Sequence, residues 1–261
     1  MRSAVARRTA LAASAAALAL LATACGGDDK ADKGGSGEDK GGAAASSAPA
    51  AKALTAAELE KAALTQADVK SGKVTEKVSG AEAAAQDKVK ADDAACAPIA
   101  YVQNGSYVGK PSATVLRKWT GEPKKPAAGA SDEEKFLAGM DASSVMVTLA
   151  SYENGGAEQA MKDLSAAAEK CAGGFSITVA GEKTKVLKVA TTDAPKGGDE
   201  ALAMTVTIQA DEGIEASSKG VVVRKGATLA YFPAFNLAAA ATGKDFDFPT
   251  EIVDAQLTKL G

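Results

Sequence analysis

The residues best suited to chemistry in this 261-residue chain are its three cysteines, Cys25, Cys96 and Cys171. The thiolate form of cysteine is a nucleophile and a metal ligand. Cys25 lies at the junction between an apolar run, Ala10–Leu21, and the polar stretch Gly26–Asp29. A lone thiol at such a junction is a candidate for covalent modification, so the segments on either side of it must be interpreted first.

Residues 1–24 have the three parts of an export signal. The chain starts with a basic segment and continues with an apolar run that is too short for a bilayer-spanning helix, which needs about twenty residues. Small residues then precede Cys25, as cleavage by a signal peptidase requires. The tetrad Ala22-Thr23-Ala24-Cys25, which follows two leucines, resembles the lipobox of bacterial lipoproteins.

The lipobox resemblance implies a membrane anchor. In that family the signal is cut before the cysteine and the thiol carries a diacylglycerol, with palmitate as a usual chain, so Cys25 would be the lipidated N-terminus at the outer face of the cell membrane. The sequence departs from the pattern at one place, because the usual leucine three positions before the cysteine is Ala22, with Leu21 one step earlier. The alternative interpretation is an ordinary secretory signal with a chance cysteine.

Charge and composition exclude several classes of function. Removal of residues 1–24 takes away three arginines and no acidic residue, so the formal net charge goes from −3 to −6. Nucleic-acid binding needs clustered positive charge, and we expect no nucleic-acid partner. The chain has no histidine, which excludes Ser-His and Cys-His catalysis and His-ligated zinc. No motif indicates a catalytic residue, a metal site or a cofactor.

The mature chain divides into a linker and one domain. Gly26–Lys52 contains no bulky apolar side chain, so residues 25–52 are predicted to be the lipidated cysteine and a disordered linker. Residues 53–261 are long enough for a single domain with its own core. On the oxidising side of a membrane, Cys96 and Cys171 are expected to form a disulfide; the alternative is two buried free thiols.

Periodicity predicts the elements of this domain. Thr55-Ala56-Ala57-Glu58 has the spacing of a capping box and starts a short helix, whereas 121–135 is predicted to be a loop and 70–95 has no clear pattern. A longer helix follows Asn154–Gly156 and ends near Cys171, and Pro249 opens a final helix. Alternating apolar residues predict a series of strands near 113–119, 145–150, 175–179, 186–189, 202–209, 221–223 and 229–235. Short turns between consecutive strands predict an α+β fold, with an antiparallel sheet covered on one face by helices.

The order of these elements and of the cysteines resembles the PknH-type extracellular sensor domain and its lipoprotein relatives. The resemblance is carried by "CAPIA" at Cys96–Ala100, by Val145–Gly174 and by the helix at Pro249–Leu260. It implies a pairing of Cys96 with Cys171 and a non-catalytic module that binds or senses a ligand. The second cysteine pair that this family often carries late in the domain is absent here, and so is any kinase motif.

Three aromatic residues are the candidates for ligand binding: Trp119 among several lysines, and Tyr231 and Phe235 in the run "YFPAF". Each could equally be part of the core, since single aromatic residues are usually structural. We expect a membrane-anchored, non-catalytic ligand-binding or sensor-like module whose ligand is a small molecule, a lipid or a wall component. The alternative is a carrier that holds a lipid or glycolipid in an apolar cavity between sheet and helices, and a wall hydrolase is the weakest hypothesis.

Overall fold

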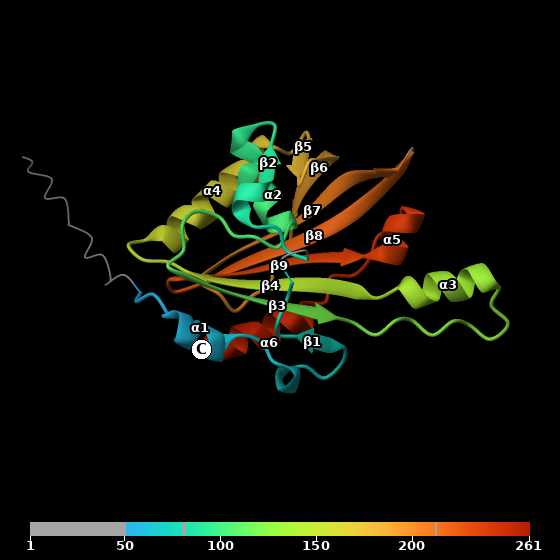
Figure 1. Cartoon of the computed structure of the whole chain (residues 1–261), viewed down its shortest axis with the longest axis horizontal. Helices are drawn as coiled ribbons and strands as arrows, with labels where there is room; N and C mark the ends of the chain where they lie inside the picture. The colour runs from blue at the N-terminus through green and yellow to red at the C-terminus, as the bar shows by residue number, and fades with distance from the viewer. Residues whose placement is uncertain (1–50, 80–81, 212) are drawn as a thin grey trace, which may run out of the picture. The chain divides into compact units, whose positions relative to one another are not determined.

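All strands of the domain belong to one sheet. The computed structural model describes residues 51–79, 82–211 and 213–261, and the nine strands among them are all antiparallel, in the order β1-β3-β4-β9-β8-β7-β6-β5-β2 (Figure 1). Their bounds are β1 Lys73–Thr75, β2 Val89–Ala91, β3 Ala113–Thr120, β4 Ser143–Ser151, β5 Phe175–Val179, β6 Glu182–Thr192, β7 Glu200–Asp211, β8 Ile214–Lys225 and β9 Thr228–Asn236. The predicted α+β fold with an antiparallel sheet is confirmed.

The described residues contain six α-helices, and these lie on both faces of the sheet rather than on the one face expected (Figure 1). Helices α2 and α4 share one hydrophobic core with the sheet, and α1 and α6 share a second core on the opposite face. Their bounds are α1 Ala56–Ala62, α2 Ala97–Gln103, α3 Asp132–Met140, α4 Gly156–Lys170, α5 Leu237–Thr242 and α6 Thr250–Leu260.

The reason for two covered faces lies in the central strand β9. Tyr231 and Phe232 are adjacent, point to opposite faces, and are both fully buried in different cores. A strand that is buried on both faces is apolar throughout instead of alternating. The continuous apolar run from Leu229 to Phe235 has this pattern, which explains why helices cover both faces rather than the one predicted.

Local sequence explains where two helices begin. Thr55 accepts a hydrogen bond from the backbone N–H of Glu58 and completes the predicted capping box of α1. The loop predicted for 121–135 is wrong at its end, because α3 begins at Asp132. Ser131 and Glu134 form a second capping box there, and the three acidic residues that open α3 favour the positive end of the helix dipole.

The cysteines join two helices of the first core. Cys96 precedes α2 and Cys171 follows α4, and both side chains are almost fully buried. Their Cα atoms lie 5.8 Å apart with the sulfur atoms in bonding contact, a geometry compatible with the expected disulfide.

Candidate functional site

A mainly apolar, open groove of about 570 Å³ lies on the face of the sheet that carries α2 and α4. Its lining comes from seven strands that are neighbours in the sheet, from β3 to β5, and from the adjoining ends of α2 and α5. Small-molecule sites typically have volumes of roughly 300–1,000 Å³ and mainly apolar walls. The groove fits both criteria.

Strand periodicity places the apolar side chains in the groove. In β7, Met204 and Val206 are buried in the core that α2 and α4 share, and Ile208, the next residue on the same face, reaches the groove and is only half-buried. The same extension occurs in β9, from Tyr231 to Phe235. The apolar groove residues are Met146, Ile177, Val179, Ile208, Pro233, Phe235 and Leu237. The groove is therefore the part of this sheet face that the helices leave open.

Leu237 and Phe136 are the two large hydrophobic side chains that stand out as exposed among the described residues, at 59% and 66%. Leu237 is the first residue of α5 and lines the groove, whereas Phe136 lies on α3 and does not. The pair therefore offers a matched comparison between an exposed apolar side chain inside the groove and one outside it.

One ion pair is the only ionised feature among the described residues that line the groove. Lys118 Nζ lies 2.6 Å from a carboxylate oxygen of Glu82. The hydrogen bond from Lys118, together with those from Ser79, lowers the pKa of the Glu82 carboxyl below its usual value. The remaining polar lining residues are uncharged, namely Gln103, Asn104, Ser144, Thr184 and Ser218.

The Gln103 amide is held in place by the protein itself. Ser218 Oγ donates to its Oε1 and also contacts the backbone oxygen of Ala234. Its Nε2 is buried over Gly220 and has no hydrogen-bond partner within the described residues. Because that nitrogen is shielded from the groove space, we assign it no part in ligand recognition.

Trp119 lies at the edge of a second, more polar cavity of about 960 Å³ between the α3 segment and the loop after α5. Its ring is wedged between Gly72 and Gly121, its Nε1 donates to the backbone oxygen of Ser71 at 2.9 Å, and only 4% of the residue is exposed. Lysines and carboxylates both line this cavity. The contacts of Trp119 are those of a structural wedge.

Tyr231 is fully buried, away from both cavities. Its hydroxyl lies 2.7 Å from that of Tyr152 and accepts the backbone N–H of Val108, while Tyr152 donates to the Val108 oxygen. Burial raises the pKa of Tyr231 to about 12 and raises that of Tyr152 as well. Of the three aromatic candidates, the structure places only Phe235 in the groove.

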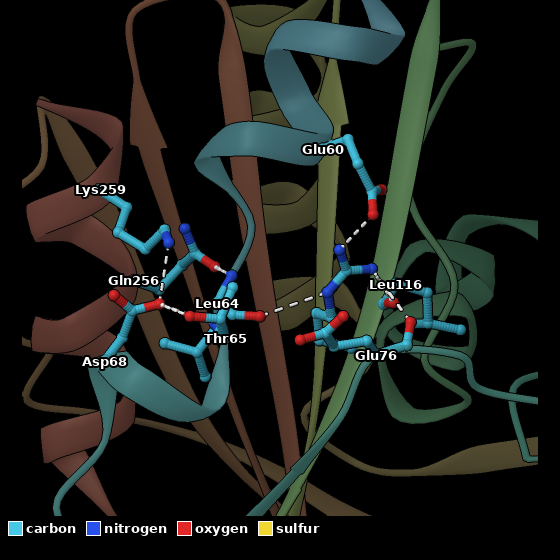
Figure 2. Close-up of polar contacts among 9 residues, drawn as sticks. Glu60, Leu64, Thr65, Asp68, Glu76, Leu116, Gln256 and Lys259 are labelled. Carbon is cyan, nitrogen blue, oxygen red and sulfur yellow. Dashed lines mark hydrogen bonds and ion pairs between the residues drawn. The ribbon is translucent and has the colours of Figure 1, made fainter.

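The clearest polar network lies elsewhere, where the N-terminal segment crosses the sheet (Figure 2). Arg117 of β3 is 5% exposed, and its guanidinium donates to the backbone oxygens of Leu64, Glu76 and Leu116 and to the carboxylate of Glu60. Four of its five N–H donors are thus bonded to the protein.

Gln256 and Lys259 of α6 hold the same segment from the other side (Figure 2). The buried Gln256 amide accepts from Leu64 N and donates to the backbone oxygen of Ala62. Lys259 pairs with Asp68 at 2.8 Å. Partial burial would raise the pKa of Asp68, but hydrogen bonds from Lys259 and Thr65 outweigh it and lower the pKa. This network fastens α1 and the turn after it to the sheet.

The described residues offer no sign of metal or proton-transfer chemistry. They contain no cluster of three or more metal-ligating side chains. A general acid at neutral pH needs a raised pKa, yet the carboxyl groups here whose pKa is shifted are all shifted downward. Within the same residues, no helix has the length and hydropathy to cross a bilayer. Cys25 and its flanking signal lie outside the described residues.

The chain has weak structural likenesses among solved proteins. The chain matches no known family model and no curated protein. It is similar to the extracellular domain of PknH from Mycobacterium tuberculosis, with a TM-score of 0.45 and 11% identity over 80% of this chain and 95% of that one. It is also similar to an uncharacterized protein of Mycobacterium smegmatis, an Rv0999 ortholog, with a TM-score of 0.34 and 12% identity over 73% and 87% of the two chains. Both TM-scores are below 0.5, so neither likeness carries an argument about this chain.

Proposed function

We propose that this protein is a non-catalytic, lipid-anchored extracytoplasmic binding module whose ligand site is the groove beside α2. The observation that carries the proposal is the row of half-buried apolar side chains from neighbouring strands, including Met146, Ile208 and Phe235, around an open volume of ligand size. A ligand that covers this exposed apolar surface removes it from water, and this makes the free energy of binding more favourable.

The anchor and the linker complete the proposal. The lipobox-like tetrad ending at Cys25 supports lipidation, and the composition of residues 26–52 supports a linker between this cysteine and a single domain over 53–261. The first helix of that domain, α1, is held to the sheet by Arg117.

The absence of catalysis is supported by composition and by the groove itself. The chain has no histidine, and the ionisable groups that line the groove, Glu82 and Lys118, are engaged with each other.

A second candidate is the carrier of a lipid or glycolipid, and the apolar lining of the groove favours it. A binding module would exchange its ligand readily, whereas a carrier would retain a lipid through purification. The two functions share the site and differ in how long it stays filled.

Binding of Nile red, an uncharged apolar dye, tests the site in the full chain with Cys25→Ser, which removes acylation. We expect saturable binding, weakened about tenfold by Leu237→Ser or by Ile208→Thr because both change the groove lining. The control Phe136→Ser removes a side chain of similar exposure outside the groove and leaves binding unchanged. Equal loss in all three variants, or no binding by the unsubstituted chain, would refute the groove as the site.

A further inference from the structure

The chemical class of ligand can be argued from the charges that line the groove. Among the described residues that line it, Glu82 and Lys118 are the ionisable ones, and they form one ion pair at 2.6 Å. Their side chains are 38% and 28% exposed, so they lie at the rim rather than on the floor. The net charge of the lining is therefore zero, and no single charge is left over.

Binding of a ligand with an ionised head group would be unfavourable in this groove. The head group would lose hydration on entering the groove and would find a counter-charge only by separating Lys118 from Glu82. The carboxylate of Glu82 is also held by Ser79, through both the backbone N–H and the hydroxyl, which further stabilises the existing pair. An anionic head would be repelled by Glu82 and a cationic head by Lys118.

An uncharged polar head avoids this cost. The groove lining has amide and hydroxyl groups at Asn104, Ser144 and Thr184, which can donate or accept hydrogen bonds without a net charge. Most of the remaining lining is apolar and can cover the methylene groups of a hydrocarbon chain.

Resting on the function proposed above, we propose that the groove takes an uncharged amphiphile: one hydrocarbon chain with a neutral hydroxyl, ester or amide head. The chain lies against the apolar residues from Met146 to Leu237, and the head lies at the rim beside the Lys118–Glu82 pair. The groove excludes ionised amphiphiles because Lys118 and Glu82 are already paired with each other.

Calorimetric titration with three probes of the same chain length tests this class. The probes are monolaurin, laurate and dodecyltrimethylammonium, used at pH 8 and below their micelle thresholds with the full chain carrying Cys25→Ser. We expect monolaurin to bind at least about tenfold more tightly than either ion, because only the ions must open the ion pair.

Two variants with opposite effects serve as internal controls. Glu82→Gln frees Lys118 and is expected to improve laurate binding about tenfold relative to monolaurin binding in the same variant. Lys118→Met frees Glu82 and is expected to improve binding of the cationic probe instead. Both side chains are partly exposed, so folding should survive either change.

The outcomes separate this inference from the function on which it rests. Laurate or the cation binding as tightly as monolaurin, with Nile red still lost in the Leu237→Ser variant, would overturn the ligand class and leave the site standing. Nile red binding without binding of monolaurin would also overturn the class. Failure of both Nile red and all three probes to bind would overturn the binding function itself.

Discussion

At the scale of single residues, Arg117 is the side chain on which the attachment of the N-terminal segment most depends. Replacement by methionine keeps the length but leaves three backbone oxygens without their donor, and we expect a loss of about 2–3 kcal/mol in the free energy of unfolding. Urea unfolding with an unchanged m-value would measure it. Glu60→Gln is the matched control, since its 60% exposed side chain should contribute less than about 1 kcal/mol. Equal effects would contradict the network's role.

The aromatic residues of β9 show how much of a single residue's surroundings the sequence can predict. Tyr231, Pro233 and Phe235 share one face of β9, yet Tyr231 is buried under the helices and Phe235 lines the groove. Strand periodicity predicts the shared face. It cannot predict where α2 ends above the strand, because that depends on contacts between distant segments.

At the scale of elements, the disulfide joins the helices of the first core. Because 75 positions separate Cys96 and Cys171, the chain-entropy model predicts that Cys96→Ala with Cys171→Ala lowers the free energy of unfolding by about 4–4.5 kcal/mol. Nonreducing peptide mapping should recover one cross-linked peptide pair. Two free thiols in the mature protein would contradict the pairing.

The segment that carries α3 should loosen in acid. A hydrogen bond from Lys124 and another from Asn236 lower the pKa of Asp141 below its usual value of 3.8, although partial burial opposes the shift. The stabilisation by its carboxylate is therefore complete above that usual value and is lost as the pH falls through the lowered one.

Fluorescence of Trp119, the sole tryptophan, can follow this change because Trp119 and Asp141 line the same cavity. We expect a transition below the usual pKa of 3.8 that Asp141→Asn removes, since the amide cannot gain a proton in this range. Asp132→Asn, at the fully exposed start of α3, should retain the transition. A transition that persists in the Asp141 variant would have another origin.

Secondary-structure elements were predictable from the sequence where a single apolar pattern determines their type. Strands β4, β5, β7 and β9 follow clear apolar alternation or a continuous apolar run and were predicted near their observed positions, whereas β6 and β8 were predicted only in part, at 186–189 and 221–223. The edge strands β1 and β2 have three residues each in a polar, alanine-rich region, so pairing with β3 and β5 decides their conformation. The groove was unpredictable for the same reason, since it is a gap in the cover over strands from distant parts of the chain.

At the scale of the whole molecule, the proposed anchor predicts one labelled position. Growth of the native host with labelled palmitate should label the chain, and Cys25→Ser should abolish the label because the thiol is the acceptor in the lipobox pattern. Cys96→Ser is the control and should keep the label, since its position in the domain is separate from the signal. A labelled Cys25→Ser chain would show that the anchor lies elsewhere.

Native mass spectrometry of the full chain, purified under mild conditions from its own host, tests whether the groove holds an uncharged amphiphile. We expect one discrete, noncovalent adduct per chain with the mass of such a molecule. The adduct should be reduced by Leu237→Ser and by Ile208→Thr and retained by Phe136→Ser. An adduct that persists unchanged in both groove variants would contradict the claim. So would a bare mass in a chain that also fails to bind Nile red.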